Sequence, residues 1–298
     1  MGFDPDTCQM LISAKAAGAD FTSVVTLGRQ WMFVDPALLK VYCQRLGKLS
    51  PEQQENLEAK NGFGENFLHI LGSKDPQSMD ASDYEQATIV HDLNQPIPQE
   101  LQQKFDAVID GGTLEHVFNF PVAVRNAMEM TKVGGRLFLF TPGNNFMGHG
   151  FYQFSPELLY RVLSPANGFQ VERMLAKEMG STKFFEVADP DSLKHRVALV
   201  NHKPVVLMVQ AKRLAAVPIF ARTPQQSDYV ESWHGNTEAS AGKPPPKLLE
   251  GVRRTVMTIV PARTRLFLRR IMWEPLRAPI RHRKLSLHNR KHFHSTPM

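Results

Sequence analysis

The sequence is poor in the features that define several protein classes. It has only two cysteines, Cys8 and Cys43, which provide neither a disulfide framework nor metal-ligand spacing. No apolar run approaches the roughly 18 residues that a membrane-spanning helix needs. Residues 1–20 lack the basic start and apolar stretch of a signal peptide. We therefore expect a cytoplasmic protein in a reducing compartment.

Excess positive charge is missing from most of the chain and gathers near its end. Residues 241–298 hold 14 Lys/Arg and 2 Asp/Glu, a charge of +12, so the other 240 residues sum to −6 within a net charge of +6. This segment predicts contact with an anionic membrane surface or an acidic partner, or else a solvated tail. Residues 248–276 mix apolar residues with paired arginines, as in a helix lying on a membrane. Nucleic acid ranks lower as a partner, because interleaved aromatics are absent.

Short apolar runs alternate with helical patterns up to residue 214. This alternation predicts an α/β fold with a mostly parallel sheet and helices on both faces. We predict strands at 21–27, 67–71, 87–91, 105–109, 136–140 and 169–174, a further strand end at Met79–Asp80, and an antiparallel hairpin at 197–209. We predict helices at 36–46, at 122–130 and after Ser155, a polar insertion at 47–66, and a turn at Gly134–Gly135 before the strand at 136–140.

The predicted domain organisation has three parts. Residues 1–214 form the α/β domain, and residues 215–247 form a linker that contains three consecutive prolines at 244–246. Residues 248–298 are expected to be a basic tail, partly helical or disordered, that stays apart from the core.

Three motifs carry a resemblance to a known family. They are FDAVIDGGTLEHV (105–117), VGGRLFLFTPGNN (133–145), and FSPELLYRVL (154–163) with NGF (167–169). In order and spacing this block resembles class I S-adenosylmethionine-dependent methyltransferases of the Leu-Glu-His type, and a looser similarity extends from Phe21 to Val209. The resemblance implies a Rossmann-like fold, S-adenosylmethionine as cofactor, and methyl transfer to oxygen or nitrogen of a small-molecule or glycan acceptor.

The first loop departs from the family. After the first strand only Gly28 remains of the expected glycines, and Thr26 stands where an acidic residue is usual. Arg29 or Gln30 could instead contact the cofactor carboxylate, since a guanidinium is a planar bidentate donor. The alternative is a non-catalytic domain that has lost its cofactor. A nucleotide-sugar enzyme is disfavoured, because no Gly-x-Gly-x-x-Gly follows the first strand.

The resemblance assigns the remaining cofactor contacts to residues that follow predicted strands. Asp80 would accept the ribose hydroxyls, Asp92 would face the adenine amino group with a backbone contact from Leu93, and Asp110 and Gly111 would line the cofactor. Asp80 suits a turn or helix-cap role equally well, and the alternative for Asp92 is a cap of the loop before Pro96.

Candidate catalytic residues follow the two predicted strands of the motif block, at 105–109 and 136–140. His116 could take a proton from the acceptor, and Glu115 could orient it. His149 lies in a glycine- and aromatic-rich loop, where Phe151 and Tyr152 would contact the acceptor. His116 could instead cap or pack a helix, Glu115 could bind a metal or be exposed, and the aromatics of the loop could pack on the core. No metal is predicted, because the adjacent pair Glu115 and His116 chelates poorly without further ligands.

Overall fold

The computed structural model describes residues 2–58, 62–234 and 286–298, and these divide into two compact units. The first unit contains residues up to 187, 202–224 and 295–298. Of the described residues, the second contains 188–201, 225–234 and 286–294. The predicted basic helix at 248–276 lies outside the described residues. No described helix is long and apolar enough to cross a membrane.

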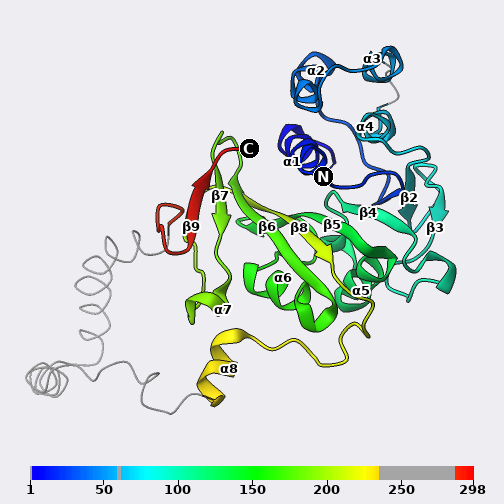
Figure 1. Cartoon of the computed structure of the whole chain (residues 1–298). Helices are drawn as coiled ribbons and strands as arrows, with labels where there is room; N and C mark the ends of the chain where they lie inside the picture. Colours follow the sequence, from blue (N-terminus) through cyan, green and yellow to red (C-terminus); the bar gives the residue numbers. More distant parts are fainter. Residues whose placement is uncertain (1, 59–61, 235–285) are drawn as a thin grey trace, which may run out of the picture. The chain divides into compact units, whose positions relative to one another are not determined.

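A mixed sheet forms the centre of the first unit (Figure 1). Its strands are β1 (Val24–Leu27), β2 (Gln77–Asp80), β3 (Ile89–Val90), β4 (Phe105–Asp110), β5 (Thr131–Asn144), β6 (Phe169–Glu178), β7 (Phe184–Val187) and β8 (Val205–Arg213). Their order is β3-β2-β1-β4-β5-β8-β6-β7. The strands from β3 to β5 are parallel, and β8 runs antiparallel to both β5 and β6. The predicted parallel core is therefore confirmed, and its first five strands follow the doubly wound order.

Helices cover both faces of this sheet. They are α1 (Pro5–Ala16), α2 (Pro36–Cys43), α3 (Pro51–Glu58), α4 (Glu65–Leu71), α5 (Phe120–Met130) and α6 (Pro156–Val162). Alternate residues of a strand point to opposite faces. Ile109 and Phe138 join the core cluster that includes buried residues of α1 and α4, whereas α5 contacts β4 and β5 without joining that cluster. The remaining elements are α7 (Pro190–Leu193) and α8 (Ser227–His234) in the second unit, and β9 (Phe293–Thr296), which spans the unit boundary.

Three predicted elements are wrong. The apolar run 67–71 is the helix α4, because Gly72 ends it in a left-handed conformation and its residues pack on α1 and α3 rather than in the sheet. The hairpin at 197–209 does not form, since β8 begins only at Val205 and pairs with β5 and β6. The turn at Gly134–Gly135 is instead an irregularity inside β5, where the register with β4 shifts.

The end of the chain does not stay apart from the core. Met298 packs against the hydrophobic cluster of the first unit, and Arg173 of β6 donates to the carbonyl of Pro297 at 3.0 Å. Residues 295–298 belong to the first unit, so the predicted tail boundary at 248 does not describe them.

Candidate active site

The carboxyl ends of three parallel strands meet at one edge of the sheet. Leu27, the last residue of β1, lies opposite Met79 of β2 on one side and Asp110 of β4 on the other. Gly28, Asp80 and Gly111 follow or end these strands, so the structure brings these three predicted cofactor residues together. Ligands of open α/β sheets bind at this edge.

Gly28 and Gly111 face the side chain of Gln30. Gly28 has a φ of 70°, which favours glycine, and a Cβ there would lie 2.8 Å from Thr113 Oγ1. A Cβ on Gly111 would collide with Gln30 Oε1. The two glycines thus create a space at the strand ends, and Gln30 enters it.

The Gln30 amide has a buried oxygen with no partner. Its Nε2 donates to the carbonyls of Leu27 and Gly28, which fixes the orientation of the amide. Its Oε1 has no hydrogen-bond partner, although the residue is only 6% exposed. An acceptor without a donor suits an ammonium group, so the predicted contact of Gln30 with a carboxylate does not fit.

Arg29 is engaged away from this space. Its Nε lies 2.7 Å from Glu65 Oε1, its Nη1 donates to the carbonyl of Glu85 at 2.9 Å, and its guanidinium lies 4.0 Å from the centre of the Phe63 ring. A cofactor carboxylate would have to compete with these three contacts.

Asp80 and Asp92 lie at the ends of the adjacent strands β2 and β3. Asp80 Oδ1 accepts from the amide of Ala81, and its Oδ2 lies 3.8 Å from the position of a Cβ on Gly28. Asp92 is exposed and accepts from the backbone and side-chain nitrogens of Asn94, and these hydrogen bonds lower its pKa. Leu93 is buried, and its carbonyl accepts from Asn126 at 3.2 Å.

Asp110 holds the turn after β4. Its Oδ1 accepts from the backbone amides of Gly112, Thr113 and Leu114, while its buried Oδ2 has no partner. Burial and the nearby charge of Glu115 raise the pKa of Asp110 to about 8. The sequence did not indicate the part played by Thr113, whose hydroxyl donates to the carbonyl of Leu27 and links the two strand ends.

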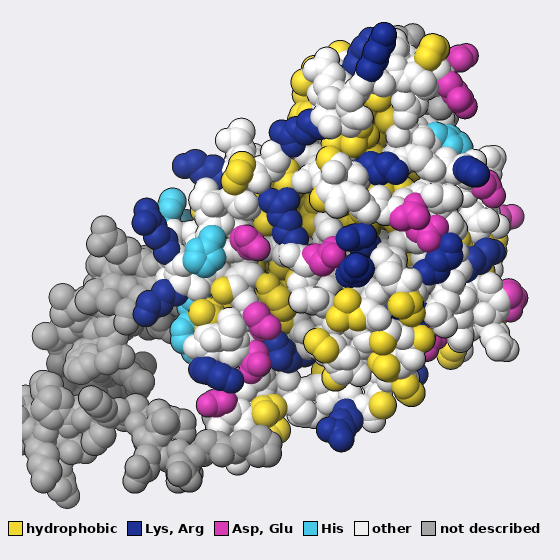
Figure 2. Space-filling view, in the orientation of Figure 1, with side chains coloured by type: hydrophobic (Ala, Val, Ile, Leu, Met, Phe, Trp, Pro, Cys, Tyr) yellow, Lys and Arg dark blue, Asp and Glu magenta, His cyan; other side chains and the backbone are white. Residues whose placement is uncertain are grey.

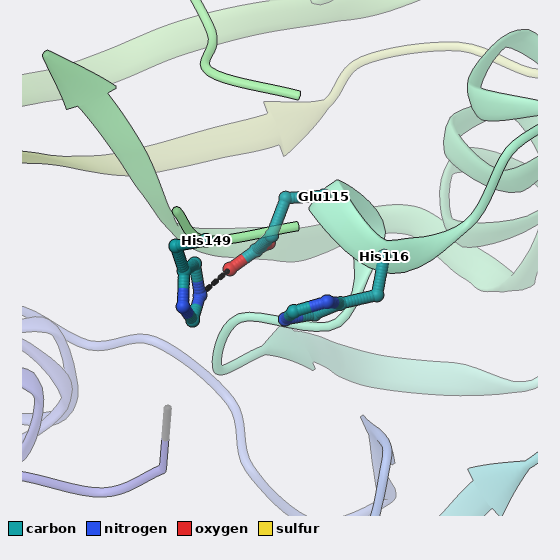
Figure 3. A group of neighbouring side chains, drawn as sticks. All are labelled: Glu115, His116 and His149. Atoms are coloured by element: carbon teal, nitrogen blue, oxygen red, sulfur yellow. Dashed lines mark hydrogen bonds and ion pairs between the residues drawn. The ribbon is translucent and has the colours of Figure 1, made fainter. Parts of the chain in front are cut away.

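Glu115, His116 and His149 form one cluster (Figure 3). Glu115 and His116 lie on a 3₁₀ turn, and His149 comes from the loop after β5. Glu115 is fully buried, and its Oε1 lies 3.3 Å from His149 Nε2. The two imidazole rings approach edge to face with centroids 4.8 Å apart, and burial lowers the pKa of both. Glu115 thus contacts His149 and not the adjacent His116, which it was expected to orient.

The backbone clamps the His149 loop onto Glu115. The amides of Phe151 and Tyr152 donate to the carbonyl of Glu115 at 2.7 and 3.2 Å. Gly150 has a φ of 67°, and a Cβ there would lie 2.8 Å from the same carbonyl. Only glycine allows this close approach, so the residue after His149 helps to fix the imidazole beside the carboxylate.

Exposed aromatic rings lie beside this cluster. Phe118 and Phe151 are 72% and 66% exposed, with ring centroids 5.8 Å apart. Tyr152 differs, since its hydroxyl donates to the carbonyl of Phe118 and its ring stacks on buried Phe154. Phe151 is therefore available to an acceptor and Tyr152 is tied to the protein. Phe118 was missed, although an aromatic two residues after His116 was a usable signal.

Comparison with known proteins gives a similarity of fold. No family model and no curated protein sequence matches the chain. Solved structures that are similar include TehB from Haemophilus influenzae, at 14% identity and a TM-score of 0.35, with 68% of this chain and 61% of TehB covered. A second is the 1,6-didemethyltoxoflavin-N1-methyltransferase of Burkholderia thailandensis with bound S-adenosylhomocysteine. It has 10% identity and a TM-score of 0.38, with 71% of this chain and 82% of the methyltransferase covered.

A third similar structure belongs to a protein that is named as a synthase and not as a methyltransferase. It is the branched-chain polyamine synthase from Thermus thermophilus, at 11% identity and a TM-score of 0.37, with 72% of this chain and 58% of the synthase covered. This chain therefore spans about three fifths of the length of TehB and of the synthase. At these identities and scores the similarities carry no argument about the reaction.

Proposed function

We propose that the protein is an S-adenosylmethionine-dependent methyltransferase that acts on oxygen or nitrogen of a small-molecule acceptor. The observation that carries this proposal is the unpartnered Oε1 of Gln30, which is buried between Gly28 and Gly111 at the carboxyl edge of the sheet. A hydrogen-bond donor is the partner that this oxygen lacks, and the ammonium group in the methionine portion of the cofactor is such a donor.

Residues of this chain would hold the cofactor along the strand ends. Gly111 leaves room for the side chain of Gln30 beside Gly28, and Gln30 would accept from the ammonium group of the cofactor. Asp80 would accept from the ribose hydroxyls, and Asp92 with Leu93 would contact the adenine. When bound, the cofactor supplies a methyl group on a sulfonium, which is a good leaving group.

The acceptor would bind between the exposed aromatic rings and the imidazoles. Phe118 and Phe151 offer apolar surface to a planar or sugar ring. His116 or His149 would take the proton that the attacking hydroxyl or amine loses. Much of the rate would come from alignment of the acceptor with the methyl group, because little acid or base assistance is required.

Calorimetric titration with S-adenosylmethionine and S-adenosylhomocysteine tests this function. The wild-type protein should bind both, and Gln30→Ala should bind about 10-fold more weakly because one hydrogen bond to a charged group, about 1.4 kcal/mol, is lost. Glu85→Ala is a control, since Glu85 Oε1 contacts Trp31 Nε1 outside the Gly28–Gly111 space.

Two results would reject the proposal. Absence of binding to the wild type would leave the non-catalytic alternative, with Gln30 filling the site. Tighter binding by Gln30→Ala would show that Gln30 excludes the ligand and does not hold it.

A further inference from the structure

We infer that Glu115, His116 and His149 bind one divalent transition-metal ion of the Zn²⁺ or Co²⁺ class. The three side chains belong to two segments that are more than thirty residues apart, and they point toward one gap (Figure 3). Each offers one ligand atom, and these atoms all lie within 4.8 Å of one another.

The distances suit a metal with bonds of about 2.1 Å, whose tetrahedral ligands lie about 3.4 Å apart. Glu115 Oε1 and His149 Nε2 are already separated by 3.3 Å. His116 is exposed, so a modest side-chain rotation can bring its nitrogen closer to the other two ligand atoms. Two ligands are thus in place, and the third can adjust.

The surroundings of Glu115 supply the second argument. Its side chain is fully buried, and its Oε2 has no partner. A buried carboxylate with one unpartnered oxygen is costly unless a cation or a proton neutralises it. Asp110, also fully buried, has a second unpartnered carboxylate oxygen on the adjoining turn. A dication in the gap would take the place of the protons that otherwise neutralise these buried carboxyl groups.

Backbone hydrogen bonds also hold Glu115 and the His149 loop together. The carbonyl of Glu115 accepts two amide hydrogen bonds from the His149 loop, and Gly150 permits that approach. Such support orients the ligands of a metal before it binds. Two imidazoles with one carboxylate favour zinc, cobalt or iron over magnesium, which prefers oxygen ligands.

Three protein ligands leave a coordination position open, as in catalytic zinc sites. An acceptor hydroxyl could occupy it and lose its proton more easily, with the proton passing to solvent. This last role rests on the proposed methyltransferase function, whereas binding of the cation does not. With the cation bound, both imidazoles are ligands, so the metal replaces them as the group that promotes loss of the acceptor proton.

The test is titration of the full, EDTA-treated chain with Co²⁺ and Zn²⁺, without cofactor or acceptor. We expect one Co²⁺ per chain at this site, with visible d–d absorption, and displacement by Zn²⁺. His149→Ala and Glu115→Gln should each weaken binding at least 100-fold, and the exposed His116→Ala, which has least effect on folding, at least 10-fold. Circular dichroism checks the fold of each variant.

His69→Ala is the matched control, because the chain has 11 histidines that could bind metal adventitiously. His69 lies on α4 and is half-buried like His149, and its Nδ1 lies 2.8 Å from the carbonyl of Ser73. This variant should bind Co²⁺ as the wild type does. Wild-type affinity in folded His116→Ala and His149→Ala, or absence of binding in the wild type, would overturn the inference.

Calorimetry with S-adenosylmethionine on the same samples separates the two proposals. Cofactor binding without metal binding would overturn only this inference. Metal binding without cofactor binding would support the site and overturn the methyltransferase function.

Discussion

Glycine residues at the strand ends determine what can approach the backbone there. Gly111 has no room for a Cβ, because Gln30 Oε1 already lies at that position. We expect Gly111→Ala to push Gln30 out of the space and to weaken binding of S-adenosylhomocysteine at least 10-fold, as judged by calorimetry. Gly148→Ala is the control, since Gly148 is exposed and a Cβ there meets nothing within 4 Å. Equal affinity of both variants would show that the ligand binds elsewhere.

The buried thiol of Cys43 makes stability depend on alkaline pH. Burial raises its pKa to about 11, whereas a cysteine in an unfolded chain has a pKa of about 8.5. Because the folded pKa is the higher one, the stabilising contribution is complete below pH 8.5 and is lost as the pH rises toward 11.

Urea denaturation of Cys43→Ala measures this contribution. Between pH 8 and pH 10.5 the wild type should lose about 2 kcal/mol more unfolding free energy than the variant, which has no thiol to titrate at residue 43. Cys8 is present in both proteins and cancels in the comparison. Parallel pH profiles for the two proteins would contradict the prediction.

The predicted site residues were identified by their position in the chain and not by their contacts. Apolar runs that end in Gly28 and Asp110, with a weaker signal at Met79–Asp80, indicate strand ends, and strand order then brings those ends together. The direction of the Gln30 amide and the contact of Glu115 with His149 depend on rotamers and loop closure. Neither leaves a pattern in the sequence.

At the scale of elements, one predicted strand is a helix and one helix was overlooked. Five apolar residues at 67–71 fit a buried strand or a buried helix equally well, and only packing distinguishes the two. The helix α1 was overlooked although Asp4 and Pro5 are a good start signal, with Asp4 Oδ1 accepting from the amide of Thr7 at 2.8 Å.

Loss of this cap should destabilise the first unit. We expect Asp4→Ala to lower the unfolding free energy by about 1 kcal/mol, because one amide at the helix start loses its acceptor. Asp75→Ala is the control, since Asp75 is exposed and begins no helix. Thermal and urea denaturation of the three proteins provide the measurement, and equal stability of both variants would contradict a capping role.

At the scale of the whole molecule, charge separates the C-terminal region from the rest. The described surface shows acidic and basic side chains interspersed on the face in Figure 2. The sequence places a charge of +12 in residues 241–298 and −6 in all the others. Composition predicts this asymmetry well, but it could not predict that residues 295–298 return to pack on the first unit.

We expect this segment to direct the full chain to anionic membranes. Binding to vesicles with about 30% anionic lipid should weaken at least 10-fold between 50 and 300 mM salt, because screening reduces the attraction. Replacing four arginines by glutamine should weaken it at least 10-fold at low salt, at Arg253, Arg254, Arg269 and Arg270. The control variant loses the same charge from four exposed lysines of the first unit, at Lys40, Lys48, Lys74 and Lys183. Co-sedimentation compares the three proteins. Equal losses in the two variants would show that net charge alone drives the binding, and salt-insensitive binding would contradict an electrostatic role for the segment.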